Sequence, residues 1–183
     1  MAFSVLWIVA IGLTLASWTF LHADDLSARQ AKLNVGYYLL HRLCNDEAQL
    51  PLLLDVKHAP DAIEGFAIKV SKTAKASNAL LEQMEAGDRG LNFDKNPLPS
   101  IEQDVRASIQ DEKKHELLFG TRDEAFVRAL LVSQIEASNY GHNLAKVLSE
   151  QESDPNRIKA LTRISVQWMA IRREAFRLLS STP

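Results

Sequence analysis

The sequence predicts an all-α protein, and three observations lead to this prediction. Apolar residues recur at spacings of three and four in segment after segment from Leu26 to the C-terminus. No run of alternating apolar and polar residues, the pattern of a half-buried strand, interrupts them. Proline, glycine and capping residues mark the ends of the expected helices. We therefore expect one helical domain over residues 26–181, preceded by an N-terminal segment of different character.

The N-terminal segment, residues 3–21, carries no charge and is dominated by aliphatic and aromatic side chains. This composition is typical of an export signal over residues 1–23, and cleavage after Ala23 would leave Asp24 as the first residue. Residues 3–21 are also long enough to cross a bilayer of about 30 Å as an uncleaved anchor. Both alternatives predict an extracytoplasmic protein, which is periplasmic, secreted or anchored to the inner membrane.

The sequence of the first half of the domain predicts two helices. The first covers residues 26–57 and is interrupted near Pro51, which removes one backbone hydrogen bond from the helix. The second begins at Pro60 and ends near Gly87. Its expected buried face consists of Ile63, Phe66, Ala67, Val70, Ala74, Ser77, Leu81 and Met84. Turn and breaker residues then fill positions 87–99, which we expect to link the two halves.

The second half predicts three helices. Ser100 to Gln103 reads as a capping box that opens a short helix to about Phe119, and Gly120 is expected to end it in a left-handed conformation. Thr121 to Glu124 reads as a second capping box that opens a long helix to about residue 150. Its expected seam is Phe126, Leu130, Ser133, Ala137, Tyr140, Leu144 and Val147.

The last helix is expected to begin at Asp154 and Pro155, a cap followed by a first-turn residue. Its apolar face is Ile158, Leu161, Ser165, Trp168, Ile171, Ala175 and Leu179. Trp168 is expected in the core. An exposed recognition patch of Trp168 with Met169, Arg172 and Arg173 is the alternative.

Composition excludes several classes of protein. The net charge is −2 without blocks of one sign, so the chain lacks the basic surface of a nucleic-acid-binding protein. Cys44 is the only cysteine, which rules out an intrachain disulfide, and its apolar neighbours predict a buried thiol. A domain of this length can bury a sufficient core without a metal or another cofactor.

Several short motifs resemble those of a known family. They are Asp46-Glu47-Ala48-Gln49-Leu50, Gly65-Phe66-Ala67, Ala125-Phe126-Val127-Arg128-Ala129-Leu130 and the helix-turn-helix that follows. The layout of two helix pairs, turning at residues 58–61 and 153–156, resembles the exported bacterial family catalogued as a domain of unknown function, number four-one-four-two, and often labelled an outer membrane protein. The resemblance implies a ferritin-like antiparallel four-helix bundle with a short extra helix, and it implies no established catalytic activity. Histidines that many members carry midway along the second and fourth helices are absent here.

A carboxylate-bridged di-iron centre is the main enzymatic alternative, because bundles of this class build such centres from Glu and Glu-x-x-His motifs. Glu112 and His115 have that spacing once, and Glu47 and Glu136 are the further candidate ligands. A second Glu-x-x-His motif is missing. The motif that is present lies in a charged run, residues 111–116, which is typical of a solvated helix face.

The remaining polar residues have structural interpretations. We expect His41 to be a partly buried, hydrogen-bonded ring and His58 to cap the end of the first helix. Gly141 beside His142 is expected to permit a close helix crossing. The seam residues Ser133, Tyr140 and Ser165 either line a small polar cavity or bond locally to backbone carbonyls.

The sequence therefore predicts a non-enzymatic helical bundle that needs no cofactor and acts by surface interaction with a protein or another component of the cell envelope. It predicts no nucleic-acid partner, and contact with a membrane only if residues 3–21 are retained. A metal-binding or redox protein is the alternative.

Overall fold

The structure, a computed structural model, describes residues 28–88, 90–120 and 123–182. Its helices cover residues 28–48, α2 (Leu50–Leu54), α3 (Asp61–Gly87), α4 (Ser100–His115), α5 (Asp123–Gln151) and α6 (Pro155–Ser181). A π-helical turn, Glu116–Gly120, continues α4. These described residues contain no strand, which confirms the predicted all-α class.

Two predictions lie outside the described residues. One is the N-terminal export segment, residues 1–23, and the other is the capping box that begins at Thr121. Within the part of the chain that the structure describes, no helix has the length and hydropathy needed to cross a membrane.

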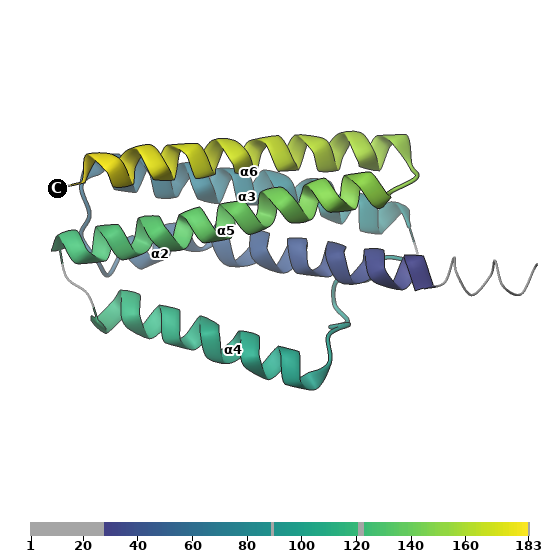
Figure 1. Cartoon of the computed structure of the whole chain (residues 1–183), viewed down its shortest axis with the longest axis horizontal. Coiled ribbons are helices and arrows are strands. Elements are labelled where there is room, and N and C mark those ends of the chain that lie inside the picture. The colour runs from purple at the N-terminus through teal and green to yellow at the C-terminus, as the bar shows by residue number, and fades with distance from the viewer. Residues whose placement is uncertain (1–27, 89, 121–122, 183) are drawn as a thin grey trace, which may run out of the picture.

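Hydrogen bonds and ion pairs between the long helices show in which direction each helix runs. Helix 28–48 is antiparallel to α3, because Ala48 contacts Ser71 while Asn34 contacts Gly90 at the other end. Helix 28–48 is also antiparallel to α5. Glu47, near the end of helix 28–48, contacts Gln134 in the first half of α5, and Tyr37, which comes earlier in the chain, contacts Glu152 just after α5 ends. The short turn after α5 makes α6 antiparallel to α5, and the ion pair of Lys69 with Glu174 places α6 beside α3 (Figure 1).

One long connection crosses the bundle. Since α3 and α5 both run opposite to helix 28–48, they are parallel to each other, and residues 88–122 must lead from the end of one to the beginning of the other. This crossover contains α4, which Figure 1 shows set off from the remaining helices. The fold thus consists of two antiparallel pairs of long helices joined by a crossover that carries α4, with the short α2 between the two helices of the first pair.

The core lies between helix 28–48, α3, α5 and α6. Its largest fully buried side chains include Tyr37, Phe66, Phe126 and Trp168. The predicted face of α3 is confirmed except at Met84, which is only partly buried. The predicted face of α6 is confirmed over its middle, including the core position of Trp168, and near its end the buried leucine is Leu178.

The predicted seam of α5 is wrong over much of its length. The side chains of Tyr140 and Val147 are exposed. The buried positions beyond the first turns are instead Leu131, Gln134, Ser138, Gly141, Ala145 and Leu148. Several of these buried residues are small or polar, so the apolar pattern, which favoured Tyr140, Leu144 and Val147, selected a neighbouring stripe of the helix.

Gly141 explains why small residues occupy this face. A Cβ atom placed on Gly141 would lie 2.8 Å from Leu43 Cδ2 and 3.1 Å from Trp168 Cδ2. Gly36 stands in the same relation to Leu148, at 2.6 Å from its Cδ2. Helix 28–48 and α5 therefore approach each other closely, and the predicted close crossing at Gly141 is confirmed.

Helix ends follow the predictions in part. Gln49 breaks the first helix two residues before Pro51, near the expected position. Asp154 Oδ1 accepts hydrogen bonds from the N–H groups of residues 156 and 157, which confirms the predicted cap of α6. Pro60 precedes α3 as its N-cap and does not form its first residue.

The predicted start and end of the short helix are wrong. Pro99 is the N-cap of α4, and its carbonyl accepts the N–H groups of Glu102 and Gln103. Ser100 is thus already helical and makes no capping box. Gly120 ends the π-helical turn without a left-handed backbone, because the chain leaves α4 through a widened turn.

Candidate functional site

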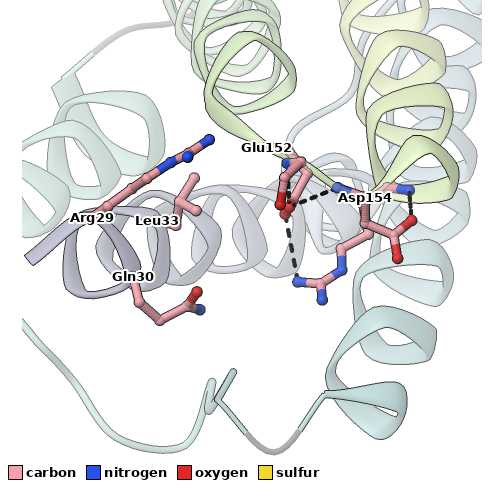
Figure 2. Close-up of a pocket in the computed structure, with 7 residues that line it drawn as sticks. Arg29, Gln30, Leu33, Glu152 and Asp154 are labelled. Atoms are coloured by element: carbon pink, nitrogen blue, oxygen red, sulfur yellow. Dashed lines mark hydrogen bonds and ion pairs between the residues drawn. The ribbon is translucent and has the colours of Figure 1, made fainter. Parts of the chain in front are cut away.

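Two depressions that contain charged residues are lined in part by helix 28–48. The first lies at the end of the bundle, where the start of helix 28–48 faces the turn between α5 and α6 (Figure 2). It has a volume of about 430 Å³. Its lining consists of Arg29, Gln30, Leu33, Glu152, Ser153, Asp154 and Arg157.

The polar groups of this end pocket bind one another. Glu152 Oε2 accepts a hydrogen bond of 2.7 Å from the Tyr37 hydroxyl, and its Oε1 accepts the N–H groups of Ser153 and Asp154. Arg157 contacts Glu152 at 3.4 Å and Asp88 at 2.6 Å. Since Arg157 pairs with Glu152 and Asp88 within the protein, we interpret this network as a structural link that joins helix 28–48 to the ends of α3 and α5 and to the beginning of α6.

Ionisation at the end pocket supports the same interpretation. Burial alone would raise the pKa of Glu152, but the hydrogen bonds from Tyr37 and from two backbone N–H groups outweigh it, so the pKa is lowered. Burial and the neighbouring carboxylate raise the pKa of Tyr37. At neutral pH the network therefore holds an ionised Glu152 and a neutral tyrosine, and no proton is poised for transfer.

The second depression is a cleft between α4 and the bundle, hereafter the α4 cleft. Its volume is about 520 Å³. Helix 28–48 and α5 form its floor and α4 forms its opposite wall. The apolar and aromatic lining residues are Tyr38, Leu39, Leu43, Leu98, Val105, Ala107, Ile109, Ala137 and Tyr140.

The α4 cleft exists because α4 does not join the core. None of its residues is buried, and Ile101, Val105 and Ile109 are 71%, 46% and 50% exposed. An ion pair of 2.8 Å between Lys113 and Glu136 connects α4 to α5. A surface helix normally buries its apolar stripe against the core. The apolar side chains of α4 instead remain exposed beside an open groove.

Glu47 is the residue of the α4 cleft with the most unusual environment. Its Oε2 accepts a hydrogen bond of 2.8 Å from Nε2 of Gln134, which is buried in α5. Burial raises the pKa of Glu47 to about 7, and the hydrogen bond from Gln134 acts in the opposite direction. A carboxyl group with this pKa changes its charge near neutral pH.

The residues predicted for a metal site are not brought together. Glu47 and Glu136 both line the α4 cleft, but Glu136 is paired with Lys113. Glu112 and His115 are exposed on α4, and the His115 ring packs on Phe119. Among the described residues, no group of three or more histidine, cysteine or acidic side chains is suitably placed for a metal ion.

The other predicted histidines have separate environments. His41 is partly buried, stacks on Phe93 and contacts Asn45, as predicted. His58 is exposed and makes no hydrogen bond to described residues, so its predicted capping role is wrong. It follows α2 in an irregular turn that carries it away from the helix end.

His142 and Ser165 form a link between α5 and α6. The Ser165 hydroxyl lies 2.9 Å from His142 Nδ1 and 3.1 Å from the His142 carbonyl. Of the three polar seam residues, Ser133 and Tyr140 line the α4 cleft, whereas Ser165 bonds within this link. Cys44 is buried as predicted, and burial raises the pKa of its thiol to about 12, so the thiol stays protonated.

Sequence reasoning missed Gln134 and the cleft itself. The helical period of α5 is compatible with a buried side chain at Gln134. A buried glutamine in turn indicates a polar partner nearby. That partner, Glu47, lies 87 positions earlier in the chain. Only the packing of helix 28–48 on α5 brings the two residues together.

Comparison of the chain with protein-family models, with curated proteins and with solved structures finds no match. The resemblance to the exported family therefore remains a prediction from the sequence.

Proposed function

We propose that this chain is an exported, ferritin-like helical-bundle protein of the cell envelope that acts by binding and not by catalysis, with the α4 cleft as its binding site. The observation that carries the proposal is the open α4 cleft itself. It combines exposed apolar side chains on α4 with a mixed floor on helix 28–48 and α5.

The course of the chain supports the ferritin-like part of the proposal. Two antiparallel helix pairs joined by one long crossover, residues 88–122, form the arrangement of that class of bundle. The extra helix α4 belongs to this crossover. It thus adds a wall to one side of the bundle without altering the core.

The export part of the proposal is supported by the sequence of residues 3–21, which are uncharged and apolar. The resemblance to an exported bacterial family gives the same location. A binding role in the envelope would need neither a cofactor nor a reactive side chain. It fits the protonated, buried thiol of Cys44 and the ion pair of Arg157 with Glu152 in the end pocket.

An apolar fluorescent probe tests the binding role of the α4 cleft. We expect N-phenyl-1-naphthylamine, which is neutral near pH 7, to gain fluorescence with the purified protein and to saturate at one site. Ala137 lines the cleft, so Ala137→Trp should fill it and abolish the signal. Ala170→Trp, on an exposed position of α6 outside the cleft, is the matched control and should bind the probe normally.

Equal probe binding by all three proteins, or none by the wild type, would refute the assignment of the cleft. Circular dichroism of each variant checks that the helices are retained.

The metal-binding alternative has its own measurement. We expect protein purified without chelator to contain no stoichiometric iron, manganese or zinc, and its melting temperature to be the same with and without EDTA. Near-stoichiometric metal that is lost in Glu47→Ala or Glu112→Ala would favour the alternative over the proposed binding role.

A further inference from the structure

We propose that the α4 cleft binds a small organic cation, a protonated amine with an apolar body, with the Glu47 carboxylate as its counter-ion. The inference rests on the proposed function and names the class of ligand. It is carried by the unpaired carboxylate at the floor of the cleft and by the balance of charge around it.

The Glu47 carboxylate is held in place by a hydrogen bond to one of its two oxygens. Gln134 Nε2 donates to Oε2, and this donor is fixed because Gln134 is 2% exposed. The second oxygen, Oε1, has no hydrogen-bond partner among the described residues. It is not among the fully enclosed unpaired atoms of the described residues, so it has surface accessible to solvent, and Glu47 lines the cleft. A ligand that donates a hydrogen bond can reach it there.

The charged side chains that line the cleft carry one more negative charge than positive charges. The charged lining residues are Arg42, Asp46 and Glu47 on helix 28–48, Glu102, Arg106 and Lys113 on α4, and Glu136 on α5. Glu102 pairs with Arg106 at 2.7 Å and Glu136 pairs with Lys113 at 2.8 Å.

Arg42 and Asp46, the other two charges, are exposed and oppose each other in sign. Of the acidic residues on the floor of the cleft, Asp46 and Glu136 are exposed and Glu47 is partly buried, so the excess negative charge is least hydrated at Glu47. A monovalent cation would neutralise it, whereas an anion would add to the imbalance.

The surroundings of Glu47 select an amine with an apolar body over a bare metal ion. A metal ion needs several oxygen or nitrogen ligands, and no group of three or more histidine, cysteine or acidic side chains among the described residues is placed to supply them. An ammonium group needs only hydrogen-bond acceptors and can keep part of its hydration. Leu39, Leu43 and Ile109 line the same cleft and can cover an attached hydrocarbon or aromatic group.

Titration calorimetry with matched ligands tests the inference. The probes share one skeleton: phenethylamine is a cation, 2-phenylethanol is neutral and 3-phenylpropionate is an anion. At about pH 8 we expect the amine to bind about tenfold or more tightly than the alcohol, because it alone makes a charge-assisted hydrogen bond. The carboxylate should bind least.

Glu47→Gln is the matched variant, because it keeps the shape of the side chain and removes the charge. We expect it to bring the amine and the alcohol to equal affinity. Lowering the pH of the wild type to about 5.5 should weaken the amine about tenfold by protonating Glu47, and should leave the alcohol unchanged.

Equal affinity of the amine and the alcohol for the wild type would overturn the inference. Equal affinity is also expected if the Lys113 ammonium group, and not a ligand, is the counter-ion of Glu47. If the neutral naphthylamine probe still bound the wild type and not Ala137→Trp, the cleft would remain a binding site and only the ligand class would be wrong. Loss of that probe signal as well would refute the proposed function.

Discussion

Replacing Glu47 by glutamine should stabilise the protein at neutral and alkaline pH. The pKa of this carboxyl rises from its ordinary value of 4.5 to about 7 on folding because of burial. Between these values the folded state holds a proton that the unfolded state has released, so the free energy of unfolding falls as the pH rises. The difference corresponds to about 3 kcal/mol, since one pKa unit is worth about 1.4 kcal/mol.

Glu47→Gln removes this dependence and keeps the hydrogen bond from Gln134, because the new side chain retains an acceptor oxygen. The free energy of unfolding of the variant, relative to wild type, should therefore rise by about 3 kcal/mol between about pH 4 and about pH 8. Urea unfolding followed by far-ultraviolet circular dichroism at several pH values measures it.

Glu136→Gln is the control for this experiment. Its carboxylate is exposed and paired with Lys113, so its removal should change stability by about 1 kcal/mol at most. A pH-independent difference between Glu47→Gln and wild type would refute the reasoning, as would destabilisation by Glu47→Gln at alkaline pH. Either result would mean that the carboxylate is fully hydrated or is compensated by a cation of the protein.

Three further predictions concern the fold and the N-terminus. Gly141→Ala should be less stable than Gly65→Ala by about 1–3 kcal/mol in thermal or urea unfolding, because its Cβ meets Trp168 whereas that of Gly65 meets nothing within 4 Å. Equal stability would mean that the helices do not cross closely. Asp154→Ala should cost about 0.5–2 kcal/mol through loss of the cap of α6, whereas Ser100→Ala should be nearly neutral; the reverse order would contradict the assigned caps. Mass spectrometry of the native protein should find Asp24 at the N-terminus, and a chain that begins at the initiating methionine would exclude cleavage.

Helix positions could be predicted from the sequence because their determinants are local. The spacing of Phe66, Val70 and Ala74 along one helix depends only on the helical period, and these residues are buried as expected. The cap at Asp154 is set by its neighbours two and three positions later. The predictions that failed at Ser100 and Gly120 concerned helix ends, where a shift of one residue changes the role of each side chain.

The α4 cleft was decided by tertiary structure. The sequence indicated a short extra helix after residue 99 with a charged, solvated run at residues 111–116, and it made Glu47 a candidate ligand, but it did not indicate that a cleft would separate α4 from the bundle. The sequence also predicted an α5 seam that contains Ala137 and Tyr140, whereas the close approach at Gly141 turns the neighbouring stripe, which contains Gln134, toward the core. Burial of Glu47 and the unpaired charge that results depend on contacts between residues far apart in the chain. The period of one helix fixes which residues share a face, but only the packing of several helices fixes which face is covered.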